Sequence, residues 1–174
     1  PGRGLKVLSG VTLDCAGHTI TGNSQGYGIL LDDAIGAEVR NCRLTNVRRG
    51  LRISGGQNNK LINNESFGNR YGIDLANATT GNLIQGNTIR DNRDEGIHIG
   101  TGADRNEIRG NIFRKNKREN IYVLSAHGNI IVENTSTEAN NTAIFIKHSN
   151  NTYVANNTTA DSPIQLRGNS VGST

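Results

Sequence analysis

The segment that decides the fold is a pair of similar stretches in the middle of the chain. It reads GIDLANATTGNLIQGNTIRDNRDE at residues 72–95 and GIHIGTGADRNEIRGNIFRKNKRE at residues 96–119. The offset between the two copies is 96 − 72 = 24 residues. A repeat of this length predicts a solenoid, in which each copy is one structural unit that buries its apolar face by stacking on its neighbours.

The first short strand of this repeat recurs along most of the 174-residue chain, at intervals of 20 to 24 residues. Its copies lie at 28–31, 50–53, 72–75, 96–99, 120–123, 143–146 and 163–166. A second strand recurs around Val39, Leu61, Ile84, Ile108, Ile131 and Val154. Apolar and polar residues alternate in these strands, which is the periodicity of a β-strand.

A column of Asn residues follows the second strand. Three residues after each central apolar residue lies Cys42, Asn64, Asn87, Asn111, Asn134 or Asn157. Asn and Gly tolerate the left-handed backbone of sharp corners, and a side-chain amide can bond the same amide one repeat away. We therefore expect an internal Asn ladder at one corner of the solenoid.

These patterns predict an all-β, single-stranded right-handed parallel β-helix of about seven rungs of 20–24 residues each. A βαβ fold is excluded because no helical patterns of 10–15 residues separate the strands. We expect one domain, with an irregular N-terminal rung at 1–27, regular rungs at 28–166 and a frayed Gly/Ser/Asn-rich tail at 167–174.

The composition limits the partners of this protein. Apolar residues make up 33% of the chain and aromatic residues 4%, which suits a narrow solenoid interior better than a globular core. The net charge of +4 favours polyanions, although a mildly basic surface without a ligand is an equal alternative. Nucleic acid is disfavoured because no basic patch interleaves with stacking aromatic residues. No stretch approaches ~18 apolar residues, so no membrane span is predicted.

Neither cysteine lies in a metal-binding spacing, and no cofactor is predicted. Cys15 and Cys42 are 42 − 15 = 27 residues apart and fall at different points of the repeat. We therefore expect Cys42, in a ladder position, to be a buried free thiol, with a disulfide as the alternative. Calcium is conceivable but lacks support, because Asp32–Asp33 is the only acidic doublet outside the charged face described next.

The outward residues of the first strand form the candidate site. In order they are Leu30, Arg52, Asp74, His98, Tyr122, Phe145 and Gln165. Stacking in register would place neighbours in this column about 4.8 Å apart. We expect the catalytic residues to be Arg52, Asp74, His98 and Tyr122. The expected substrate-binding residues lie upstream of the strands or next in the column, and are Arg48, Arg49, Arg70, Tyr71, Glu95, Arg118, Glu119 and Phe145.

Such a face could bind an acidic polysaccharide and remove the proton next to a uronate carboxylate, by β-elimination or epimerisation. Both reactions need a cation, a base and an acid. Arg52 would be the cation, His98 or Tyr122 the base and the other of that pair the acid. The alternative is a solvated face on which opposite charges form cross-strand pairs worth about 0.2–1 kcal/mol each.

Residues 14–22, Asp-Cys-Ala-Gly-His-Thr-Ile-Thr-Gly, resemble the opening of the right-handed parallel β-helix repeat proteins. This resemblance covers residues 11–166. That superfamily includes pectate-lyase-like enzymes, mannuronan epimerases and a periplasmic copper-site maturation protein. Residues 71–74, Tyr-Gly-Ile-Asp, also resemble the Tyr-Gly-x-Asp core of the epimerase motif, which continues with Pro-His where this chain has Leu75–Ala76. The resemblance implies carbohydrate binding and a secreted, periplasmic or cell-surface location.

Two other functions remain open at this point. The first is a non-catalytic structural or adhesive solenoid that stacks end to end through uncapped rungs. It is favoured by the even repeat length, because long insertions usually build the groove walls of large β-helix enzymes. The second is an accessory protein for metal-enzyme assembly, which the lack of metal-ligand clusters disfavours.

Overall fold

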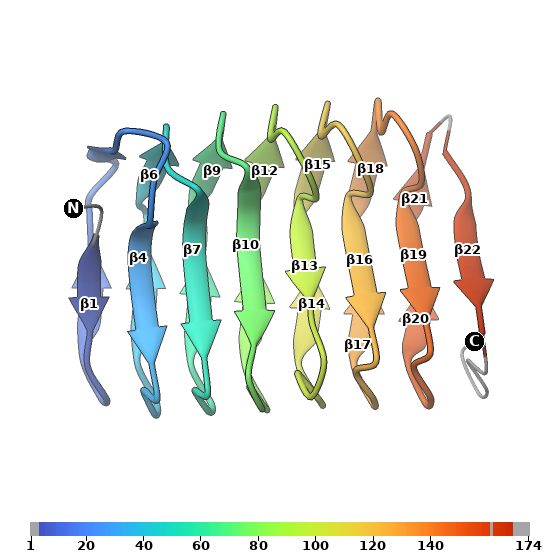
Figure 1. The fold of residues 1–174 in the computed structure, drawn as a ribbon, viewed down its shortest axis with the longest axis horizontal. Coiled ribbons are helices and arrows are strands. Elements are labelled where there is room, and N and C mark those ends of the chain that lie inside the picture. The colour runs from blue at the N-terminus through green and yellow to red at the C-terminus, as the bar shows by residue number, and fades with distance from the viewer. Residues whose placement is uncertain (1–3, 161, 169–174) are drawn as a thin grey trace.

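The computed structural model describes residues 4–160 and 162–168, and within these residues every regular element is a β-strand. The strands form three parallel sheets that run along one solenoid (Figure 1). The first sheet contains β1 (Leu5–Val7), β4 (Tyr27–Asp32), β7 (Arg49–Ser54), β10 (Tyr71–Ala76), β13 (Ile97–Ile99), β16 (Ile121–Leu124), β19 (Ile144–Lys147) and β22 (Ile164–Arg167). The two ends of the described chain lie at opposite ends of the stack.

The other two sheets contribute seven strands each. The second sheet contains β2 (Thr12–Asp14), β5 (Glu38–Arg40), β8 (Lys60–Ile62), β11 (Leu83–Gln85), β14 (Glu107–Arg109), β17 (Ile130–Val132) and β20 (Tyr153–Ala155). The third sheet contains β3 (Thr19–Thr21), β6 (Arg43–Thr45), β9 (Glu65–Phe67), β12 (Thr88–Arg90), β15 (Ile112–Arg114), β18 (Thr135–Thr137) and β21 (Thr158–Thr159). The predicted parallel β-helix is therefore confirmed.

Alternation along each strand explains why these short segments stack. In β13, Ile97 and Ile99 are fully buried while His98 between them is partly exposed. The interior is filled by such Ile, Leu and Val side chains, with Phe113 as its largest member. Each rung thus hides its apolar side chains only when a rung lies on either side, which is the physical reason for the repeat.

Three Asn ladders line the corners, although the sequence predicted only the one after the second sheet. In that ladder the side chain of Asn87 links Asn64 on one side to Asn111 on the other, with N···O distances of 2.8–3.0 Å. A second ladder precedes the second sheet at Asn59, Asn82, Asn106 and Asn129, and a third follows the third sheet at Asn69, Asn92 and Asn116. All three lie inside, where they satisfy backbone groups that water cannot reach.

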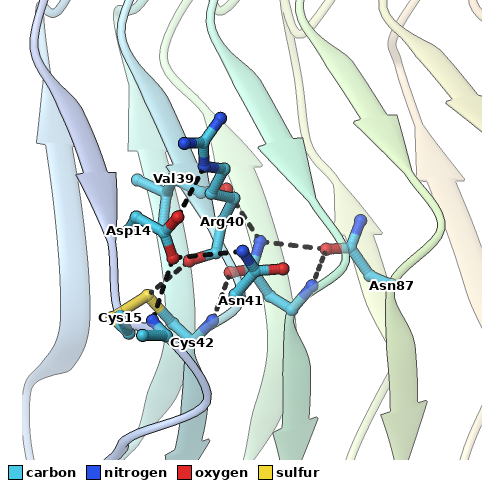
Figure 2. Close-up of a disulfide and its surroundings, with 9 residues drawn as sticks. Asp14, Cys15, Val39, Arg40, Asn41, Cys42 and Asn87 are labelled. Atoms are coloured by element: carbon cyan, nitrogen blue, oxygen red, sulfur yellow. Dashed lines mark hydrogen bonds and ion pairs between the residues drawn. A yellow bond between two sulfur atoms is a disulfide. The ribbon is translucent and has the colours of Figure 1, made fainter.

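The expected free thiol at Cys42 is wrong, because Cys42 forms a disulfide with Cys15 (Figure 2). Strands β2 and β5 pair with Asp14 opposite Arg40, so Cys15 lies one rung below the corner that carries Cys42. Their Cα atoms are 4.8 Å apart, within the range that a disulfide spans. The corner between β2 and β3 contains more residues than the corresponding corners of the other rungs, and Ala16 and Gly17 in it both have positive φ. This longer corner is the reason that Cys15 and Cys42 fall at different points of the repeat.

The N-terminal residues 1–27, predicted to be an irregular rung, contribute β1, β2 and β3, which pair in register with β4, β5 and β6. Of the predicted frayed tail at 167–174, Arg167 belongs to β22, and residues 169–174 lie outside the described part of the chain. Within the described residues, no helix has the length and apolar character needed to cross a membrane.

Candidate functional site

The outward column of the first sheet has the predicted register. Cα partners along it run Lys6, Leu30, Arg52, Asp74, His98, Tyr122, Phe145 and Gln165. A second row upstream pairs Tyr27 with Arg49 and Arg49 with Tyr71. The first sheet therefore brings together residues that lie 20 to 24 positions apart in the chain.

Asp74 is the centre of the site. Its side chain is 3% exposed, although it lies on the outward side of β10, because basic side chains cover it. Arg52 Nη1 donates a hydrogen bond to Oδ2 at 2.5 Å, and Arg49 Nε lies 2.6 Å from the same oxygen. The Arg49 N–H lacks hydrogen-bond geometry, so that contact is electrostatic. His98 Nδ1 lies 2.8 Å from the other oxygen, Oδ1.

These partners keep Asp74 ionised despite its burial. Burial by itself raises the pKa of a carboxyl group, because it disfavours the charged form. At Asp74 the hydrogen bond from His98 and the positive charges of Arg49 and Arg52 outweigh burial, and the pKa lies below its ordinary value. The cluster of Arg49, Arg52 and Asp74 carries a net charge of 2 − 1 = +1, and neither guanidinium has another acidic partner among the described residues.

The Asp74 contact determines the tautomer of His98. An ionised carboxylate can only accept hydrogen bonds, so His98 Nδ1 must carry the hydrogen and donate it to Oδ1. In the neutral ring, Nε2 then bears the lone pair. The side chain is 26% exposed, and no described residue forms a hydrogen bond with Nε2. His98 is therefore oriented as a base that can accept a proton from outside the solenoid.

Aromatic rings continue the column beyond His98. The ring centroids of His98 and Tyr122 are 5.7 Å apart, and those of Tyr122 and Phe145 are 5.6 Å apart, both stacked. Because these rings cover one another's faces, they present mainly their edges to solvent. Burial and the nearby charge of Glu119 raise the pKa of Tyr122, so its hydroxyl keeps its proton at neutral pH. In this protonated state Tyr122 has a proton to donate and cannot act as a base.

Glu95 is the second buried carboxyl group on this face. Its side chain is 5% exposed, Oε1 lies 3.3 Å from Arg118 Nη1, and Oε2 has no hydrogen-bond partner. Burial, assisted by the charge of Asp94, raises the pKa of Glu95, and His98 and Arg118 oppose this only partly. Asp74 and Glu95 therefore have pKa values shifted in opposite directions within one site, an arrangement typical of acid–base chemistry.

The remaining predicted site residues lie around this centre. Tyr71 approaches the His98 ring, with centroids 6.0 Å apart, and also faces the guanidinium of Arg70. Arg70 forms an exposed ion pair with Asp94, and Glu119 accepts a hydrogen bond from Asn141. Arg48 is exposed at the corner, as is Arg118 above Glu95. These four groups, Arg48, Arg70, Arg118 and Glu119, form no contact with Asp74.

Two contacts were missed from the sequence. The sequence predicts Arg49 to be a substrate-binding residue, but its side chain reaches diagonally to Asp74. Tyr27 lies over the guanidinium groups of Arg49 and Arg52, with distances of 5.8 and 5.5 Å from each central carbon to the ring centroid. The repeat contains the signal for Tyr27, because Tyr27 is the first residue of β4 as Tyr71 is of β10.

The described residues contain no group of three or more His, Cys, Asp or Glu that could hold a metal ion. Both cysteines are in the disulfide, and the sequence has no Met.

Comparisons with known proteins identify relatives of this architecture. An alginate lyase from Paenibacillus sp. str. FPU-7 has a similar structure, with a TM-score of 0.70 and 16% identity, over 90% of this chain and 69% of that chain. The periplasmic alginate epimerase AlgG is similar with a TM-score of 0.59 and 15% identity, over 86% of this chain and 47% of that chain. At these identities the likeness shows the fold alone.

No curated protein sequence matches the chain significantly. A family model does match, over residues 13–171, and its description is periplasmic copper-binding protein (NosD). This match covers most of the chain and agrees with the right-handed parallel β-helix predicted from the repeat. The chain therefore belongs to the NosD family.

Proposed function

We propose that this protein binds an acidic polysaccharide along its first sheet and acts on it as a uronate lyase or epimerase. The observation that carries the proposal is the contact between Asp74 and His98 next to two guanidinium groups. A base of fixed tautomer lies beside a local positive charge, and proton removal next to a carboxylate requires both. Two proteins of similar structure are an alginate lyase and an alginate epimerase, which agrees with this substrate class.

The proposed reaction begins when the uronate carboxylate lies against Arg49 and Arg52. His98 Nε2 removes the proton from the adjacent ring carbon, and the guanidinium groups stabilise the charge that moves onto the carboxylate. Asp74 stabilises the imidazolium that forms, because its negative charge lies 2.8 Å from Nδ1. Tyr122 then donates its proton, either to the leaving glycosidic oxygen, which gives elimination, or to the opposite face of the carbon, which gives epimerisation.

The roles predicted for Arg52 and Asp74 become more specific in this mechanism. Arg52 is 14% exposed and already paired, so it shares the neutralisation of the substrate with Arg49. Asp74 is too buried to touch the substrate and is a positioning residue for His98. Glu95, whose pKa is raised mainly by burial, lies within electrostatic reach of His98.

Copper does not fit the residues of this chain, although the family description names it. A copper site needs several soft or imidazole ligands in one place. Here the cysteines are bonded to each other, and the described residues hold no cluster of three ligands. A location outside the cytoplasm, secreted, periplasmic or at the cell surface, agrees with the disulfide and with the family description.

The test is to incubate the protein with polymannuronate, polyguluronate and pectate. Elimination forms an unsaturated uronate, followed by its ultraviolet absorbance, and epimerisation in deuterium oxide incorporates deuterium, followed by NMR. His98→Ala should abolish either signal. His18→Ala is the matched control, because His18 is exposed at a corner of the first rung, far from Asp74 along the stack. Absence of product, of exchange and of binding for all three polymers would refute the proposal.

A structural or adhesive solenoid is the second candidate. Strands β1 and β22 are the outermost strands of the first sheet among the described residues, and Leu5 and Leu166 on them are about half exposed. Such edges can pair with further rungs. Sedimentation velocity over a range of protein concentrations tests this: association that persists in high salt would favour it, and a single monomeric species would exclude it.

A further inference from the structure

We propose that a hollow at the N-terminal end of the first sheet, between Lys6 and Tyr27, is a subsite for one uronate residue of the polysaccharide. This inference rests on the proposed function and adds a place where the polymer is held away from the reacting residues. The hollow has a volume of about 330 Å³ and is lined by Gly4, Lys6, Tyr27, Leu30 and Asp32.

The hollow is continuous with the site already described. Lys6 is the Cα partner of Leu30, and Leu30 is the partner of Arg52. Tyr27 is the partner of Arg49. The hollow therefore lies in the same two rows as the Asp74 cluster and one rung before its guanidinium groups.

The lining has the chemistry that an acidic sugar requires. The side chains of Tyr27 and Leu30 are partly exposed and offer apolar surface to the C–H face of a sugar ring. Lys6 Nζ supplies a positive charge, held 3.0 Å from Asp32 Oδ2, and the Asp32 carboxylate can accept hydrogen bonds from sugar hydroxyls. The charges of Lys6 and Asp32 cancel, 1 − 1 = 0, and the net charge of 2 − 1 = +1 carried by Arg49, Arg52 and Asp74 lies on the rungs that follow. This excess favours an anionic ligand over a neutral one.

Two features distinguish the hollow from the aromatic column at the other end of the site. The rings of His98, Tyr122 and Phe145 stack on one another, so their faces are not free for a sugar. Tyr27, in contrast, has guanidinium groups of the next rung near its ring, and a cavity opens beside it. The sugar subsite is therefore assigned to the Tyr27 end.

The distance between the hollow and His98 determines how long a ligand must be to reach both. Leu30 and His98 are separated by three steps along the column, about 14 Å at ~4.8 Å per step. One polymer chain that occupies both places must run along the solenoid axis, across the strands. A single uronate cannot bridge them, so affinity should rise with the length of the oligosaccharide until both places are filled.

The experiment measures the binding of oligomannuronates of increasing length to the whole chain by isothermal titration calorimetry. Tyr27→Ala and Lys6→Ala are the test variants. Tyr153→Ala and Lys60→Ala are the matched controls, because these exposed residues lie on the second sheet. Neutral manno-oligosaccharides of the same lengths form the second arm. Circular dichroism and thermal unfolding establish that each variant is folded, and Lys6→Ala replaces an exposed residue whose loss should not affect folding.

We expect each test variant to raise the Kd for the longer oligomannuronates by about fivefold or more, and the controls to leave it unchanged. Neutral oligosaccharides should bind more weakly than acidic ones. If His98→Ala or Arg49→Ala weakened binding and Tyr27→Ala and Lys6→Ala did not, the subsite would be refuted and the proposed function would stand. If no oligomannuronate bound the wild-type chain, both would be refuted for this class of sugar.

Discussion

Removal of one Asn from the middle of a ladder should destabilise the protein far more than removal of an exposed Asn. The perturbation is Asn87→Ala. The Asn87 side chain is fully buried and takes part in five hydrogen bonds. Nδ2 donates to Leu61 O, Gln85 O and Asn111 Oδ1, and Oδ1 accepts from the backbone and the side chain of Asn64.

The expected magnitude follows from these bonds. A typical buried hydrogen bond contributes about 1 kcal/mol net, and a buried donor left without a partner costs about 1–3 kcal/mol. The backbone N–H and one side-chain N–H of Asn64 would lose their acceptor, whereas the Gln85 carbonyl would keep its hydrogen bond from the Asn63 backbone N–H. We expect the free energy of unfolding to fall by about 4 kcal/mol, which corresponds to a decrease in Tm of about 8–16 °C for a chain of this size.

The assay is urea denaturation followed by circular dichroism, with thermal unfolding as a second measurement. Asn140→Ala is the control, because Asn140 is exposed and its backbone does not have a positive φ. Its free energy of unfolding should change by less than about 0.5 kcal/mol. If Asn87→Ala were no more destabilising than Asn140→Ala, the ladders would not hold the rungs together and the stacking argument would be wrong.

Three further predictions concern buried charges and the disulfide. Asp74→Asn should lower the free energy of unfolding by roughly 3 kcal/mol at pH 7, since it leaves two guanidinium groups unpaired. The folded pKa of Asp74 lies below its ordinary value, so ionised Asp74 contributes its full stabilisation above the unfolded pKa. The difference in free energy of unfolding between wild type and variant should therefore disappear as the pH falls through the folded pKa. A difference that did not change with pH would contradict this. Glu95→Gln should show the opposite pH dependence, because the folded pKa of Glu95 is raised above its ordinary value of 4.5. In the same denaturation assay the variant should be as stable as the wild type at low pH and more stable than the wild type as the pH rises. Reduction of the Cys15–Cys42 bond, which closes a separation of 27 residues, should cost about 3–4 kcal/mol, and the double Ser variant should show the same loss without further response to reductant.

The fold could be predicted because a single register governs the whole chain. Once Ile97 lies above Ile73, the strands of the two copies pair residue by residue, including Asp74 with His98. Contacts that depend on how far a side chain reaches could not be predicted from the register of the strands. Arg49 crosses from its own row to Asp74, and the wide first corner displaces Cys15 towards Cys42. The repeat determines positions of Cα atoms, whereas these contacts depend on rotamers and on corner length.

The ion pairs elsewhere on the solenoid help to distinguish the Asp74 cluster from an ordinary charged face. Arg114 and Glu138 pair across neighbouring rungs with side chains 56% and 46% exposed, so water screens them and they contribute little. Asp74 is 3% exposed and is surrounded by three basic side chains, an arrangement whose desolvation cost is high. Apolar packing at the same position would stabilise the solenoid more simply. Asp74 must be desolvated, yet it fixes the tautomer of His98 and holds two guanidinium groups at the surface, and this arrangement agrees with the anionic ligand proposed above.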